Sequence, residues 1–145
     1  MNIDQAINLE DIRRIAKRKL PRIAFDFIDG GVDGEQGLLR NLEAFSDYNL
    51  IPRYLRDVSQ RDQAVTLFGQ TYSSPIGISP MGLASMFRPG GDTMMAQAAA
   101  QRNVPFLMSG SSNESIESAA KIAPDQVWFQ VYCTRDEKIN QHLVG

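Results

Sequence analysis

The chain of 145 residues contains only one cysteine and one histidine. The single Cys133 cannot form a disulfide bond within the chain, and a zinc site needs several Cys or His ligands. We therefore predict neither a disulfide nor a metal site. A chain without disulfides is typical of a reducing compartment, so we expect a cytoplasmic protein.

The sequence also lacks an excess of positive charge and a long apolar run. Its 15 Lys and Arg residues against 17 Asp and Glu residues give a net charge of −2, so we expect no nucleic-acid partner. The most apolar stretch, residues 75–87, is interrupted by Gly77, Pro80 and Gly82 and is shorter than the ~20 residues of a transmembrane helix. Residues 1–20 contain no apolar segment typical of a signal peptide, so we expect no targeting segment.

The first half of the chain has the apolar spacing of amphipathic helices. Three such patterns predict short helices over residues 9–20, 21–29 and 38–47. Asn8 is the expected N-cap of the first helix, and Pro21 is the expected first residue of the second. After a polar connector, residues 64–68 and 71–73 predict a small β-hairpin that turns at Gly69-Gln70.

The second half alternates apolar runs with helical patterns. The apolar runs are Ile76–Ser79, Val104–Ser109 and Val127–Tyr132, which begin at intervals of roughly 25 residues. The helical patterns cover residues 92–102, a segment capped by Asn113 or Ser115, and a final segment through His142 that begins with a capping box of Thr134 and Glu137. This alternation predicts an α/β fold with buried parallel strands.

Three α/β architectures fit this alternation: a doubly wound open sheet, the front of a (β/α)₈ barrel, and a small three-stranded domain. In the first two, ligands bind at the carboxyl ends of the strands. Those ends carry Ser79-Pro80-Met81-Gly82, Met108-Ser109-Gly110-Ser111-Ser112 and Phe129-Gln130-Val131-Tyr132. The chain contains no G-x-G-x-x-G, Walker A or G-x-S-x-G motif, which argues against nucleotide-motif proteins and serine hydrolases.

These segments give the sequence a resemblance to a known family. It resembles the FMN-dependent 2-hydroxy acid dehydrogenases and oxidases, which include glycolate oxidase, L-lactate dehydrogenase and mandelate dehydrogenase. The resemblance is carried in order by residues 19–22, 25–31, 41–45, 75–76 with 79–82, Ser109 and 128–132. It implies the N-terminal part of a (β/α)₈ TIM barrel, with a helical extension and hairpin over residues 1–74 and the first three βα units over residues 75–145.

The resemblance also implies FMN as the cofactor, lying across the strand ends. Pro80, Met81 and Gly82 match the segment whose backbone approaches the flavin ring near N5, and the missing Cβ of Gly82 suits such an approach. Ser109 matches a flavin-contacting hydroxyl, and Gln130 matches the amide at the pyrimidine edge. The alternatives are a plain strand-end turn at Gly82 and a polar Gln130 satisfied inside the barrel.

Two aromatic residues match substrate-binding positions of the family. Tyr132 matches the tyrosine whose hydroxyl faces the substrate. Phe27 occupies a position where the family commonly has a tyrosine that helps to hold the substrate carboxylate. Because Phe27 lacks the hydroxyl and Ser111 is small, we expect a bulkier or more apolar acid than glycolate. The alternatives are a core role for Tyr132 and a packing role for Phe27.

No residue of this chain matches the family's catalytic base or its main carboxylate clamp, which are a histidine and an arginine from late barrel strands. His142 is expected to be a surface or packing residue. The complete enzyme is expected to oxidise a small 2-hydroxy acid to a 2-oxo acid, and the 145 residues alone are expected to be inactive. The electron acceptor, whether oxygen, a quinone or a cytochrome, depends on other regions.

For the complete enzyme, the resemblance further implies a homo-oligomer. It also implies that this cytoplasmic enzyme can associate peripherally with a membrane. Two other readings of the function stay open. One is a small non-catalytic α/β binding domain of the flavodoxin-like type, and the other is a flavin or phosphate-binding barrel without 2-hydroxy acid activity.

Overall fold

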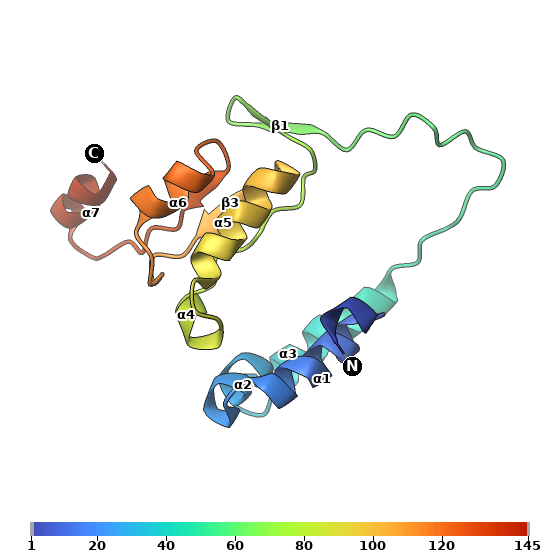
Figure 1. Ribbon diagram of the computed structural model, residues 1–145, viewed down its shortest axis with the longest axis horizontal. Coiled ribbons are helices and arrows are strands. Elements are labelled where there is room, and N and C mark those ends of the chain that lie inside the picture. Colours follow the sequence, from blue (N-terminus) through green and yellow to red (C-terminus); the bar gives the residue numbers. More distant parts are fainter. Residues whose placement is uncertain (1, 145) are drawn as a thin grey trace. The chain divides into compact units, whose positions relative to one another are not determined.

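The computed structural model describes residues 2–144, and its contacts divide the chain into two units (Figure 1). The first ends at Gln60 and the second begins at Arg61. The hairpin thus falls in the second of these units. No helix within residues 2–144 is long and apolar enough to cross a membrane.

The first unit is helical. Its elements are η1 (Ile3–Gln5), α1 (Leu9–Lys19), α2 (Arg22–Asp29), α3 (Gln36–Glu43) and η2 (Ala44–Asp47). The three predicted helices are confirmed, and the Asn8 side chain caps α1 by accepting a hydrogen bond from Asp11 N at 2.9 Å. Pro21 was expected to be the first residue of α2, but it is the N-cap. The short turn η1 was not predicted.

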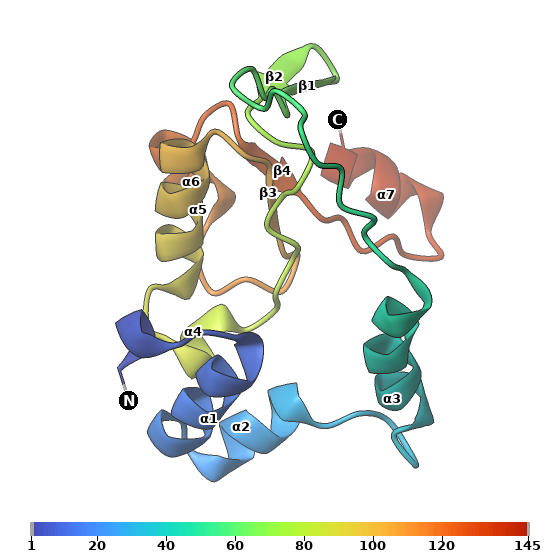
Figure 2. The same cartoon turned by 90° about the vertical axis from the view of Figure 1, so that its right-hand side faces the viewer.

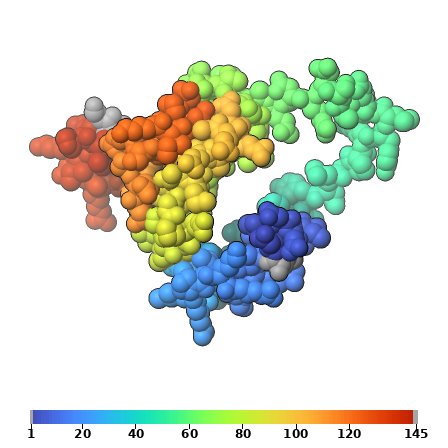
Figure 3. Space-filling view, in the orientation of Figure 1, coloured from blue at the N-terminus to red at the C-terminus, as the bar shows by residue number. Residues whose placement is uncertain are grey.

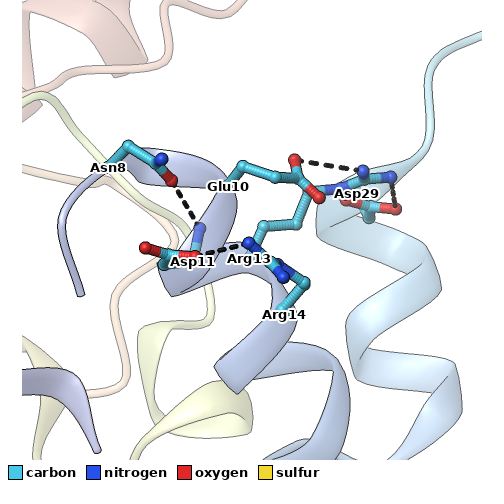
Figure 4. Close-up of polar contacts among 6 residues, drawn as sticks. All are labelled: Asn8, Glu10, Asp11, Arg13, Arg14 and Asp29. Carbon is cyan, nitrogen blue, oxygen red and sulfur yellow. Dashed lines mark hydrogen bonds and ion pairs between the residues drawn. The ribbon is translucent and has the colours of Figure 1, made fainter. Parts of the chain in front are cut away.

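An ion pair joins α1 to α2 (Figure 4). The guanidinium of Arg13 binds both carboxylate oxygens of Asp29, with Nη2 2.9 Å from Oδ2, and also lies 3.5 Å from Glu10 Oε2. The hydrogen bonds from Arg13, followed by its charge, hold the pKa of Asp29 below the ordinary value of 3.8. In turn, Asp29 raises the pKa of Arg13. The pair fixes the end of α2 beside the middle of α1.

The second unit contains the hairpin and all parallel strands. Its elements are β1 (Val65–Leu67), β2 (Gln70–Tyr72), α4 (Ala84–Phe87), α5 (Gly91–Arg102), β3 (Phe106–Met108), α6 (Ile116–Ile122), β4 (Val127–Phe129) and α7 (Glu137–Val144). The hairpin is confirmed, but the predicted turn at Gly69-Gln70 is wrong by one residue. Gln70 pairs with Leu67, and the two turn residues, Phe68 and Gly69, have positive φ, as a two-residue hairpin turn of type I′ requires.

The three predicted apolar runs lie parallel and in chain order. β3 pairs with β4 in the register Phe106 to Val127, and Ile78 forms a parallel bridge to Phe106 on the other edge of β3. Ile78 N donates to Pro105 O at 2.8 Å, and Leu107 N donates to Ile78 O at 2.9 Å. The first run contributes this single bridge rather than a full strand.

Helices α5 and α6 cover one face of this sheet (Figure 2), and they contact each other along the surface (Figure 3). The core between helices and sheet consists of small helix residues and large strand residues. These are Ala96, Ala99, Phe106, Met108, Ala119 and Ala123. Because strand side chains alternate, Leu107 and Ser109 lie on the opposite face from Phe106 and Met108.

The helix starts in this unit differ in part from the expectations. Of the two candidate caps for α6, Ser115 is the one used, and its hydroxyl accepts from Ser118 N at 3.2 Å. The predicted capping box of Thr134 and Glu137 is wrong. Asp136 Oδ1 accepts from Lys138 N at 2.9 Å directly before α7, and Thr134 lies outside the helix. The single turn α4 was not predicted, and it follows Leu83, whose φ of 55° is left-handed.

Polar contacts anchor the hairpin to the residues at and before the amino-terminal ends of β3 and β4. The hydroxyl of Tyr72 accepts from Trp128 Nε1 at 2.9 Å and donates to Asp125 O at 3.0 Å. Asn103, which ends α5 in a left-handed conformation, donates from Nδ2 to Thr71 O at 3.1 Å and accepts from the Gln126 amide at 3.0 Å. The hairpin thus covers this end of the sheet.

We predict that Tyr72→Phe lowers the free energy of unfolding by about 1–3 kcal/mol, because it removes the partner of two partly buried groups, Trp128 Nε1 and Asp125 O. Chemical denaturation measures the change. The control is Tyr54→Phe, since Tyr54 is 85% exposed and should tolerate the loss of its hydroxyl. Equal stability of the two variants would contradict the anchoring role of Tyr72.

We also predict an acid-sensitive contribution from the Arg13–Asp29 pair. Because the pKa of Asp29 is lower in the folded chain than in the unfolded chain, the pair stabilises the fold above the ordinary aspartate pKa. This stabilisation is lost as the pH falls below 3.8 toward the folded-state value. Thermal unfolding across this range should show a smaller acid-induced decline for Asp29→Asn. At about 1 M salt the two proteins should converge, since the pair is exposed to solvent. An identical decline at low salt would contradict this role.

Candidate functional site

The carboxyl ends of the three parallel segments meet at one edge of the sheet. Ser109 directly follows β3, and Gln130 directly follows β4 and extends the ladder by donating from its backbone N to Met108 O at 2.9 Å. The segment after Ile78 is joined to this edge because Leu83 N donates to Ser111 O at 3.0 Å. The sheet therefore brings Ser109, Gln130 and residues 80–82 together, as the sequence predicted.

Ser109 is the most enclosed polar group at this edge, with 2% of its surface exposed. Its hydroxyl donates to Gln130 Oε1 at 3.3 Å and accepts from Ser111 N at 3.1 Å. The amide oxygen of Gln130 is thereby engaged. Within residues 2–144, the amide nitrogen of Gln130 has no hydrogen-bond partner, so its N–H groups can serve a ligand.

The turn from Pro80 to Gly82 packs closely against the loop after β3. A Cβ atom on Gly82 would lie 3.3 Å from Ser111 Cβ and 3.6 Å from Ser109 Oγ. A side chain at residue 82 would press on Ser111, and its absence lets the backbone lie close to this loop. Met81 is 45% exposed, whereas Pro80 and Gly82 are half-buried. A turn of this kind beside the Gln130 amide can contact a flat, hydrogen-bonding ring system.

A pocket with a volume of about 190 Å³ lies beside Gln130. Its walls are formed by residues after β3, in and after β4, and in α7. They are Gly110, Phe129, Gln130, Val131, Tyr132 and Leu143. The predicted substrate residue Tyr132 thus shares a pocket with the predicted cofactor residue Gln130. Gly110, which also lines this pocket, has no role among the sequence-based predictions, although a glycine directly after a strand-end serine indicates close packing.

Two other residues considered at the sequence level lie elsewhere. Phe27 lies in α2 of the first unit, with 66% of its surface exposed, and is not among the residues that the second unit brings together. His142 is exposed on α7. Among the described residues, no group of three or more Cys, His, Asp or Glu side chains could hold a metal ion.

Comparison with known proteins gives a consistent picture. Residues 16–145 match the family model of FMN-dependent dehydrogenases. The chain is 40% identical over 126 residues to an L-lactate dehydrogenase of Alcaligenes faecalis, covering 87% of this chain and 33% of the relative. It is 35% identical over 130 residues to the (S)-mandelate dehydrogenase of Pseudomonas putida, covering 90% of this chain and 33% of the relative.

A solved structure agrees with these relatives. A mandelate oxidase mutant with a monooxide FMN adduct superimposes with a TM-score of 0.84 at 33% identity, covering 92% of this chain and 42% of that chain. The chain spans about a third of the length of the curated relatives it matches. The family model covers nearly the whole chain, and the chain therefore belongs to the FMN-dependent dehydrogenase family, whose members include L-lactate and (S)-mandelate dehydrogenases.

Proposed function

We propose that this chain supplies part of the flavin site of an enzyme that oxidises a 2-hydroxy acid to a 2-oxo acid. In this proposal residues 75–145 are the first three βα units of a (β/α)₈ barrel, and residues 1–74 are an extension to it. The observation that carries the proposal is the hydrogen bond between Ser109 and Gln130 at the carboxyl edge of the sheet, beside the backbone of Gly82. Active sites of such barrels lie at this edge.

The residues at this edge fit FMN. The Gln130 amide, held by Ser109 through its oxygen, presents N–H donors of the kind that a flavin carbonyl accepts. The backbone of Pro80, Met81 and Gly82 is the proposed surface for the ring, because this turn lies beside Ser109 at the same edge. When bound, FMN supplies the redox chemistry by accepting two electrons from the acid.

The substrate is proposed to lie next to Tyr132. Its hydroxyl can donate to a carboxylate, while Phe129 and Val131 give the same pocket apolar walls. The catalytic base and the main carboxylate clamp are proposed to come from outside these 145 residues. Phe27, which cannot hydrogen-bond a carboxylate, and the small Ser111 favour a bulkier or more apolar acid than glycolate. A homo-oligomer in the cytoplasm is the proposed state of the full-length enzyme.

The first experiment adds (S)-mandelate, L-lactate and glycolate anaerobically to the full-length protein loaded with FMN. We expect loss of the flavin absorbance, with the largest second-order rate constant of bleaching for an acid larger than glycolate. Absence of bleaching with every acid would contradict the proposed function and favour a different flavin barrel. A largest rate constant for glycolate would contradict only the substrate preference. The 145-residue polypeptide serves as the control, and we expect it to show no bleaching.

A second experiment tests the flavin edge directly. Ser109→Ala removes the donor that holds the Gln130 amide, so we expect FMN to bind roughly 2–10-fold more weakly, as the loss of one neutral hydrogen bond predicts. Titration of the apoprotein with FMN, followed by flavin fluorescence, measures the Kd. Ser73→Ala, at an exposed position near the hairpin, is the matched control and should leave the Kd unchanged. An unchanged Kd for Ser109→Ala would remove Ser109 from the proposed site.

A further inference from the structure

Gly110 lies directly after Ser109, and the ring of Tyr132 lies against it. A Cβ atom on residue 110 would be 2.8 Å from Tyr132 Cδ2 and 3.1 Å from Tyr132 Cε2. It would also be 2.7 Å from the carbonyl oxygen of Gln130. Carbon atoms in good contact are about 3.5–4.0 Å apart, so position 110 has no room for a side chain.

Backbone conformation does not account for a glycine at this position. Gly69 and Gly90 have φ values of +85° and +72°, which other residues rarely adopt. Gly110 is not among the glycines with positive φ. The requirement for glycine at position 110 therefore arises from the space taken by Tyr132 and Gln130.

These two neighbours differ in how easily they can move. The carbonyl of Gln130 is part of a backbone held to β3, since Gln130 N donates to Met108 O at 2.9 Å. Tyr132 is 58% exposed, so its ring can shift toward solvent. A Cβ atom on residue 110 would consequently displace the Tyr132 ring, and its contact with the Gln130 carbonyl would strain the ladder beside it.

We propose that Gly110 is a positioning residue for substrate binding, because the absence of a side chain at position 110 sets the place of the Tyr132 hydroxyl in the pocket that both residues line. The inference rests on the proposed function, in which Tyr132 faces the 2-hydroxy acid. Gly110 itself contacts neither the acid nor the reacting atoms in this proposal, and it acts through the tyrosine ring.

The test uses the full-length enzyme loaded with FMN. Gly110→Ala is expected to raise KM for the acid at least about tenfold, the effect of losing one hydrogen bond to a charged group. In a Tyr132→Phe background the hydroxyl is already absent, so Gly110→Ala should raise KM by less than about twofold. An equal KM increase in both backgrounds would overturn the proposal.

Two glycine variants separate positioning from loss of stability. Gly31→Ala places a Cβ atom 3.1 Å from Leu38 Cβ, a close contact within the first unit. Gly37→Ala meets nothing within 4 Å. We expect Gly31→Ala to lower Tm without raising KM and Gly37→Ala to change neither. A KM increase in Gly31→Ala equal to that in Gly110→Ala would overturn the positioning role.

An NMR measurement tests the contact without any change at position 110. In the full-length protein with labelled glycine, the Hα signals of Gly110 should be shifted by the ring current of Tyr132, and Tyr132→Leu should abolish the shift. Absence of the shift in the unaltered protein would overturn the inference even in an active enzyme. A normal shift in a protein that oxidises no 2-hydroxy acid would instead overturn the proposed function and, with it, the role of Gly110 in substrate binding.

Discussion

The candidate site depends on the parallel pairing of three short segments, and above all on the bridge between Ile78 and β3. Two backbone hydrogen bonds, from Ile78 N to Pro105 O and from Leu107 N to Ile78 O, hold the first segment beside β3. Without them, nothing in the sheet would place Gly82 next to Ser109. Because parallel strands run in the same direction, their pairing carries each following loop to the same edge. The proposed flavin site is thus assembled by main-chain bonds before any side chain contributes specificity.

Much of this arrangement could be predicted from the sequence, because its signals are local. Alternation of apolar runs with helical patterns identified the segments around Ile78, β3 and β4, and the order of Ser109 and Gln130 at their ends followed from where each run stops. Capping residues with a fixed offset, such as Asn8, were equally predictable. The resemblance to a flavoenzyme family then gave these positions a chemical meaning that periodicity cannot supply.

The features that the sequence did not predict depend on distant or competing contacts. Thr134 and Glu137 have the spacing of a capping box. However, the Asp136 side chain can also cap a helix, and it is Asp136 that accepts the hydrogen bond from Lys138 N at the start of α7. The role of Gly110 depends on Tyr132, which becomes its neighbour only when β3 and β4 pair. A contact between residues on two different strands produces no periodic pattern of apolar residues from which it could be predicted. Phe27 lies in the other unit, so sequence matching alone linked it to the strand-end residues.

The anchoring of the hairpin has a consequence for the order of events during synthesis. Tyr72 is bound by Trp128, which is 56 positions later in the chain. At about 5–20 residues per second, the ribosome adds Trp128 roughly 3 to 11 seconds after Tyr72. During this interval the hairpin has been made but its partner has not, and Tyr72 lacks the contacts that bury it in the folded chain. The nascent chain therefore passes through a period in which Tyr72 is exposed, and it ends only after Trp128 has been added.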